Sequence, residues 1–197
     1  MNTKELKKYR ANLRFWFEQA TPYEVRDGLN WYKDANSFVT EQSLKLNVDR
    51  LILSAALADL SPRNEWERNK FDLLTVVDAV KNGICQTKVK VCTFNKNKAK
   101  AFDRIKGILP LKETGMKTYS FSKNVGELDS NFVTIDSWHL RACQTRSMTR
   151  KNVKESVTAK QYKEVAELTL NVAHEYGLKG YEFQAIVWVV IRNRWMN

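Results

Sequence analysis

Residues 111–141, LKETGMKTYSFSKNVGELDSNFVTIDSWHLR, contain two successive helix starts, with a lysine at one and an aspartate at the other. Lys117 follows Gly115 and opens an amphipathic stretch, whereas Asp136 follows an apolar triplet and precedes a second helix. Side chains on one helix meet at spacings of three or four residues. Because these two residues are 19 positions apart, the chain must fold back on itself for them to meet. We take Lys117 and Asp136 as candidate catalytic residues.

The rest of the chain also predicts helices, because apolar residues recur mostly at helical spacing and only seven glycines and three prolines interrupt them. The sequence predicts an all-α fold with helices near 3–19, 22–39, 47–60, 62–82, 94–107, 116–126, 137–146, 159–176 and 180–195. The last of these contains FQAIVWVVIRNRW, which is apolar almost all round and belongs in the core. Residues 84–92 alternate in a strand-like way and predict a short extended element.

Several helix ends carry their own signals. A hydroxyl side chain at the cap accepts from the first backbone N–H groups, and proline suits the first helical position. A glycine after the last turn adopts the left-handed conformation that ends a helix. These patterns predict starts at Thr21-Pro22, Ser61-Pro62, Thr93 and Thr158, and ends at Gly107 and Gly177.

Length and charge limit the class of protein. With 197 residues and 43% hydrophobic side chains, we expect one domain spanning residues 1–197. The net charge of +11 favours an anionic partner, and nucleic acid is the first choice. A generally solvated basic surface explains the charge equally well.

Other classes are not expected. No apolar run reaches the roughly 18 to 20 residues that span a bilayer, and the start, MNTKELKKYR, lacks a signal-peptide core. We therefore expect a cytoplasmic, monomeric protein without membrane contact. The three cysteines are far apart, which favours reduced thiols and speaks against an iron–sulfur cluster. The two histidines form no zinc-like group, so no metal site is predicted.

The segment around the candidate pair resembles the helix-hairpin-helix DNA glycosylases, the superfamily of endonuclease III and 8-oxoguanine glycosylase. In that family a leucine-proline-glycine-x-glycine hairpin precedes the catalytic lysine, and a valine-proline-valine-aspartate-like segment carries the catalytic carboxylate. The matching residues are Leu111, Gly115, Lys117, Val133, Ile135 and Asp136. Lys112 and Glu113 stand where the family has its proline and first hairpin glycine, so the hairpin is degenerate.

The chain is more similar still to small phage-encoded relatives of this superfamily, with an LSPxxxWxxN segment and a QAxVWVxxR tail. The residues that fit are Ser61, Pro62, Trp66, Asn69, Gln184, Val187, Trp188 and Arg192. The resemblance implies a helical glycosylase-like fold, with the hairpin and catalytic segment at about residues 94–146. It also implies DNA as partner and no cofactor, although a monovalent cation can bind the main-chain carbonyls of the hairpin in the family.

The resemblance implies that Lys117 attacks the sugar C1′ and that Asp136 stabilises the cationic sugar, through a Schiff base that can lead to strand nicking. A lysine nucleophile must be unprotonated, which requires burial or nearby cations, and Tyr119 is placed to help exclude water. An exposed lysine at a helix start is the alternative for Lys117. A simple helix cap is the alternative for Asp136.

An enzyme acting on a base in duplex DNA must extrude it into a pocket. The candidate DNA- and substrate-binding residues are Gly115, Tyr119, Arg63, Asn64, Trp66, Asn69, His139, Arg146 and Gln184. Trp66 also fits a core position, and a buried Gln184 is a structural hydrogen bonder first. The polar loop 145–158 is either a phosphate-binding loop or a surface connection, and the basic helix 94–107 is either a phosphate-binding or a simply solvated face. On this helix Phe94 and Phe102 are expected to face inward and Arg104 outward.

Three functions remain open from the sequence. The first is a DNA N-glycosylase, with or without lyase activity, that removes a damaged or modified base. The second keeps the fold but hypermodifies thymine, as the phage alpha-glutamyl/putrescinyl thymine pyrophosphorylases do. The third is a non-catalytic DNA-binding protein on the same scaffold.

Overall fold

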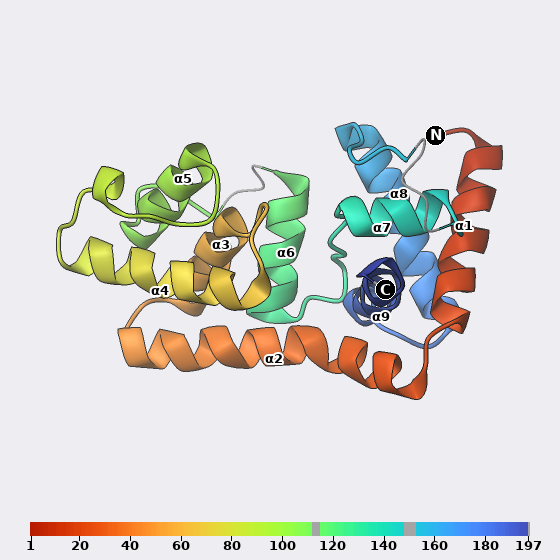
Figure 1. Ribbon diagram of the computed structural model, residues 1–197, viewed down its shortest axis with the longest axis horizontal. Coiled ribbons are helices and arrows are strands. Elements are labelled where there is room, and N and C mark those ends of the chain that lie inside the picture. Colours follow the sequence, from red (N-terminus) through yellow and green to blue (C-terminus); the bar gives the residue numbers. More distant parts are fainter. Residues whose placement is uncertain (112–114, 148–152, 197) are drawn as a thin grey trace. The chain divides into compact units, whose positions relative to one another are not determined.

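The computed structural model describes residues 1–111, 115–147 and 153–196, and these form helices without any strand (Figure 1). The elements are α1 (Thr3–Glu18), α2 (Pro22–Leu46), α3 (Arg50–Leu60), α4 (Trp66–Lys81), the 3₁₀ helix η1 (Gln86–Lys88), α5 (Asn95–Ile105), α6 (Met116–Glu127), α7 (Ser137–Gln144), α8 (Ala159–Glu175) and α9 (Gly180–Met196). The all-α prediction is confirmed. The extended element predicted at 84–92 is wrong, because this segment contains the η1 turn and the described residues offer no strand to pair with it.

Backbone contacts group the chain into two compact units. The first unit comprises Met1–Ala35 and Leu128–Asn197, and the second comprises Asn36–Glu127. Helix α2 runs through the boundary between them. The single domain expected for residues 1–197 stays a prediction.

In the first unit, α9 is the central helix and packs against α1, α7 and α8. Its side chains are buried on nearly all sides, including the fully enclosed Phe183, Ile186 and Ile191. This matches the apolar sequence of the segment. Gly28 of α2 lies so close to α9 that a Cβ atom there would be 2.5 Å from the Cα atom of Ile186. Glycine is therefore required at this helix crossing, because a side chain would clash with the backbone of α9.

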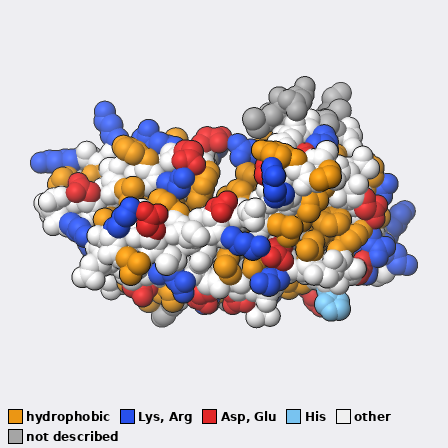
Figure 2. Space-filling model, turned by 90° about the horizontal axis from the view of Figure 1, so that it is seen from below, with side chains coloured by type: hydrophobic (Ala, Val, Ile, Leu, Met, Phe, Trp, Pro, Cys, Tyr) orange, Lys and Arg blue, Asp and Glu red, His pale blue; other side chains and the backbone are white. Residues whose placement is uncertain are grey.

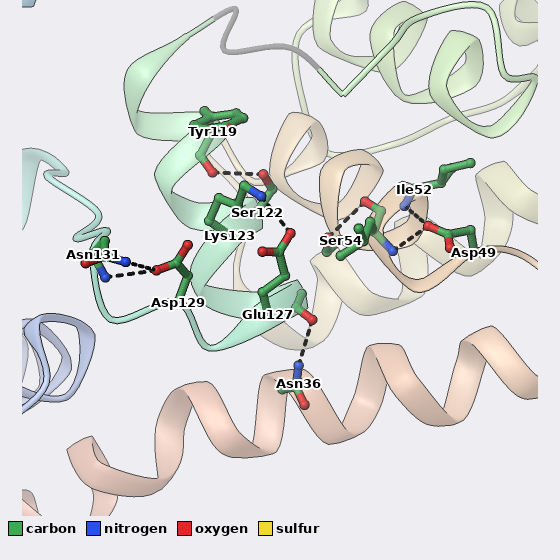
Figure 3. A network of polar contacts seen from close by, with 12 residues as sticks. Asn36, Asp49, Ile52, Ser54, Tyr119, Ser122, Lys123, Glu127, Asp129 and Asn131 are labelled. Carbon is green, nitrogen blue, oxygen red and sulfur yellow. Dashed lines mark hydrogen bonds and ion pairs between the residues drawn. The ribbon is translucent and has the colours of Figure 1, made fainter.

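In the second unit, α3 takes the central place and packs against α4, α5 and α6. All its residues from Leu53 to Leu60 are buried. The Asp49 carboxylate starts the helix by accepting from the backbone N–H groups of Leu51 and Ile52 (Figure 3). Asn36 closes the end of α6 by donating its amide to the carbonyls of Val125 and Gly126, at 2.7 and 3.1 Å.

Of the four helix starts predicted from hydroxyl caps, two are correct. Thr21 accepts from the Glu24 N–H before α2, and Thr158 forms a full capping box with Gln161 before α8. Gly107 and Gly177 have φ angles of +72° and +67°, as expected after helix ends.

The starts predicted at Ser61-Pro62 and Thr93 are wrong. The Ser61 hydroxyl donates to the Ala58 carbonyl and ends α3, while Arg63 has a φ of +60° that no helix interior adopts. Helix α4 therefore begins only at Trp66. The Thr93 hydroxyl donates to the Pro62 carbonyl, 31 residues away, so it ties two loops together and leaves α5 without a side-chain cap.

Candidate functional site

The two candidate catalytic residues belong to different compact units. Lys117 is exposed in the first turn of α6, in the second unit. Asp136 is half-buried at the start of α7, in the first unit, where its Oδ1 atom accepts from the His139 N–H at 2.7 Å. The cap predicted for Asp136 is thus present. The pairing of Lys117 with Asp136 across a base-sized pocket stays a prediction. The hairpin positions Lys112 and Glu113 lie outside the described residues.

A buried histidine lies one turn beyond Asp136. The imidazole of His139 is fully enclosed, and its Nε2 atom is 2.9 Å from the Thr169 hydroxyl. That hydroxyl already donates its proton to the Val165 carbonyl, so Nε2 must carry the hydrogen. The Nδ1 atom has no hydrogen-bond partner among the described residues. Burial lowers the pKa of His139 from 6.5 to about 4, which keeps the ring neutral. The imidazole of His139 bonds to Thr169 and does not reach the surface, so only its backbone N–H serves Asp136.

One buried tyrosine fixes the chain that leads into Asp136, and a second holds Gln184. The Tyr162 hydroxyl donates to the Val133 carbonyl at 3.1 Å and accepts from the Ile135 N–H at 3.2 Å. The Tyr32 hydroxyl donates to Gln184 Oε1 at 3.0 Å, and burial raises the pKa of Tyr32. Gln184 therefore forms a structural hydrogen bond, which is the role that the sequence predicted first.

Residues 61–69, SPRNEWERN, donate hydrogen bonds to the carboxylate of Asp72, which lies just after the segment. Asp72 has no exposed surface, and its oxygens accept from the Asn64 amide, the Arg68 Nε and the Cys92 N–H at 2.9, 2.8 and 2.7 Å. Asn69 is also buried and donates to the Leu57 carbonyl at 3.2 Å. The two asparagine amides thus bond within the protein, whereas Arg63 and Arg68 are exposed.

The remaining candidate residues are half-buried or exposed. Trp66 is half-buried and meets Phe38 edge-on at 6.3 Å. Arg146 is exposed, and its guanidinium donates to Asn12 at 2.9 Å and lies over the Phe15 ring. Gly115 is exposed, and among the described residues an added Cβ atom would lie nearest to the Thr118 hydroxyl, at 3.9 Å. Of the basic loop 145–158, residues 148–152 lie outside the described part of the chain.

Tyr119 lines a small hollow between α3 and α6, with about 60 Å³ of internal space. Lys123 and Glu127 form an ion pair at 2.7 Å along one wall, and Ser54 and Ala55 form part of the other (Figure 3). A pocket that encloses a drug-sized ligand has several hundred cubic ångströms. The hollow as described fits a few water molecules.

The second unit carries a strongly basic surface, which we call the α5 basic surface. Residues 81–106 contain one acidic residue, Asp103. On the face shown in Figure 2, lysine and arginine side chains project at the left-hand end, together with some acidic ones. The exposed lysines of the surface are Lys81, Lys88, Lys90, Lys96, Lys100 and Lys106.

The burial of Arg104 in α5 and of Phe94, just before α5, differs from the prediction. Arg104, expected on the phosphate-facing side, is 4% exposed and pairs with the buried Asp59, with 2.6 Å between Nε and Oδ2. It also donates to the Pro110 carbonyl at 2.8 Å. Phe94, expected inside, is 43% exposed, because α5 begins one residue later and Phe94 precedes its first turn.

The Asp59–Arg104 pair and the Asp72 cluster were not found by sequence reasoning. An aspartate within an otherwise apolar helix, as in LILSAALADL, was the available signal, because such a buried charge requires a partner. The identity of that partner, 45 residues away, has no local signature.

Metal ligands and membrane helices were also sought. Within the described residues, no group of three or more histidine, cysteine or acidic side chains is arranged to hold a metal ion. No helix in the same residues combines the length and apolarity needed to cross a bilayer. Cys85 and Cys92 are exposed and Cys143 is buried, all as free thiols.

These features define an all-helical protein with a buried polar network behind Asp136 in one unit and a basic surface on the other. The model of a family of unknown function, DUF7178, matches residues 1–195, and the chain belongs to this family. No curated protein and no solved structure matches the chain.

Proposed function

We propose that the protein binds nucleic acid through the α5 basic surface. The observation that carries this proposal is the six exposed lysines within residues 81–106, a segment with one acidic residue. Closely spaced ammonium groups repel one another on a free surface, and a phosphate backbone relieves that repulsion while releasing its own counterions.

A comparison of two charge-matched triple variants tests the surface. Lys90, Lys96 and Lys100 are exposed on the α5 basic surface, and Lys4, Lys7 and Lys8 are exposed on α1. Changing each set to glutamine removes three positive charges. We expect the first variant alone to weaken oligonucleotide binding and to lower the slope of log affinity against log salt by about 0.7 to 0.9 per lost phosphate contact. Equal losses from the α1 variant would assign binding to net charge instead of this surface.

We further propose that the bound DNA is the substrate of an N-glycosylase reaction, with Lys117 as nucleophile and Asp136 as electrostatic partner. The support is the resemblance of residues 111–136 to the helix-hairpin-helix glycosylases and the fixed carboxylate of Asp136. In this reaction the lysine amine bonds to C1′, the base leaves with a proton, and a Schiff base forms. A nearby carboxylate stabilises the positive charge that develops on the sugar.

Borohydride trapping on DNA containing abasic sites or modified bases tests the chemistry. Wild type should form a covalent complex, and Lys117→Gln should not. Lys160 is a matched control because it is exposed at the second position of α8, as Lys117 is in α6. Lys160→Gln should trap normally. If no complex forms, or if nucleoside analysis shows a heavier nucleoside in place of a released base, the glycosylase proposal is wrong.

A further inference from the structure

Two exposed phenylalanines accompany arginines beside the α5 basic surface. Phe94 is 43% exposed and Phe71 is 59% exposed. The Arg63 guanidinium lies 4.9 Å from the centre of the Phe94 ring, and that of Arg68 lies 5.3 Å from the Phe71 ring. A partner that covers an exposed ring removes apolar surface from water, and this burial favours binding.

The two arginine–phenylalanine pairs are held by one carboxylate. The buried Asp72 accepts from the Arg68 side chain and also from the Cys92 N–H, two residues before Phe94. On the other side of the turn, Asp72 accepts from the amide of Asn64, next to Arg63. Both pairs are therefore attached to the same rigid point of the second unit.

The charge around these rings is also suited to a polyanion. The acidic neighbours at the start of α4 are Glu65 and Glu67, and Glu67 pairs with Lys70 at 2.8 Å. Lys96, one residue into α5, and Lys90 in the preceding loop are exposed. A surface that combines cations with accessible rings and guanidinium planes matches the way proteins hold unpaired nucleotides, where bases stack on rings and cations follow the phosphates.

We propose that Phe71 and Phe94, with Arg63 and Arg68, form a stacking surface for the bases of single-stranded nucleic acid. The proposal rests on the proposed nucleic-acid binding and specifies the form of the ligand. A continuous duplex keeps its base faces stacked within itself, so it can reach the lysines but not the rings. The protein should therefore prefer an unpaired strand to the same sequence in a duplex.

The test measures binding of the full chain to three labelled probes by fluorescence anisotropy at fixed salt. The probes are a short single strand of mixed sequence, the same strand with abasic residues in its centre, and the corresponding duplex. Stacking on a ring strengthens binding by about fivefold or more per base. We expect wild type to bind the intact strand at least about fivefold more tightly than the abasic strand, and more tightly than the duplex.

The variants Phe71→Ala with Phe94→Ala, and Phe71→Leu with Phe94→Leu, separate stacking from other contacts. Both double variants should bind the intact strand as weakly as the abasic strand, with an unchanged salt slope. The leucine pair retains apolar surface without a ring. Tyr23 is the control, because it is 60% exposed and lies under Arg26 at 5.1 Å in the first unit. Tyr23→Ala should behave as wild type, and circular dichroism checks folding.

The outcomes distinguish this proposal from the one it rests on. Equal affinity of wild type for intact and abasic strands, or full binding by the leucine pair, overturns the stacking surface but leaves lysine-dependent binding intact. Absence of binding to every probe overturns both. Loss of the preference for intact strands in the lysine triple variant would show that charge alone produces it, and this too contradicts stacking.

Discussion

Asp136 has two candidate roles, as a helix cap and as a catalytic carboxylate, and a single atom change separates them. Asparagine caps helices as well as aspartate does, whereas alanine does not. We expect Asp136→Asn to keep the free energy of unfolding within a few tenths of a kcal/mol while abolishing base release. Asp136→Ala should lose about 1 kcal/mol of stability as well. Chemical denaturation measures the first effect and base release the second. Full activity of the asparagine variant would leave Asp136 with its structural role alone.

His139 makes the first unit sensitive to acid. Because burial lowers its pKa from 6.5 to about 4, the unfolded chain takes up a proton between these pH values that the folded chain does not. Stability present above pH 6.5 is therefore lost as pH falls, by about 3 kcal/mol at pH 4. Denaturant titrations across this range measure the loss.

The second histidine is a built-in control for this prediction. His174 is exposed on α8, so His174→Gln should retain the full acid sensitivity. In His139→Gln the glutamine amide can still donate to Thr169. This variant should be less stable than wild type at pH 6.5, but its free energy of unfolding should fall less between pH 6.5 and 4. An unchanged pH profile in His139→Gln would assign the sensitivity between pH 6.5 and 4 to another group.

At the scale of elements, two glycines allow close helix crossings and predict different costs. An added Cβ at Gly28 would lie 2.5 Å from the Ile186 Cα atom and 2.6 Å from its N atom, so the α9 backbone must move. We expect Gly28→Ala to destabilise by about 2 kcal/mol, because overpacking outweighs the better helix propensity of alanine. Thermal or urea unfolding measures this.

Gly126 is the milder counterpart on α6. Its added Cβ would meet the Ser54 hydroxyl at 2.5 Å and the Ser54 Cβ at 3.0 Å, and a hydroxyl can rotate away. Gly126→Ala should cost less than Gly28→Ala, about 1 kcal/mol or below. A larger loss for Gly126→Ala would show that α3 cannot adjust, contrary to this expectation.

For the whole molecule, the two compact units predict separate patterns of local unfolding. Each unit has its own core, around α9 in the first and α3 in the second. Regions with separate cores open at different free energies. By hydrogen-exchange mass spectrometry, Gly28→Ala should speed exchange mainly in α1, α7, α8 and α9, and Gly126→Ala mainly in α3, α5 and α6. If either variant speeds exchange everywhere, the chain unfolds as the single domain expected from its length.

The helices and their order were predictable from the sequence because their signals are local. The apolar spacing, the cap residue and the terminating glycine of a helix lie within a few residues of one another. The wrong predictions concern residues whose partners lie far away in the sequence. Ser61-Pro62 has the composition of a helix start, yet the Ser61 hydroxyl ends α3, because the turn is tied to Asp72 and Thr93 from later in the chain.

The amino-acid sequence by itself determined an all-helical chain, a core helix at about residues 180–195, the cap at Asp136 and a net charge of +11. Only the tertiary structure decided that Arg104 is buried against Asp59 and that Phe94 and Phe71 remain in contact with solvent. The physical reason is that helix formation depends on neighbours three or four residues away. The burial of a charge or ring depends on partners that only folding brings near.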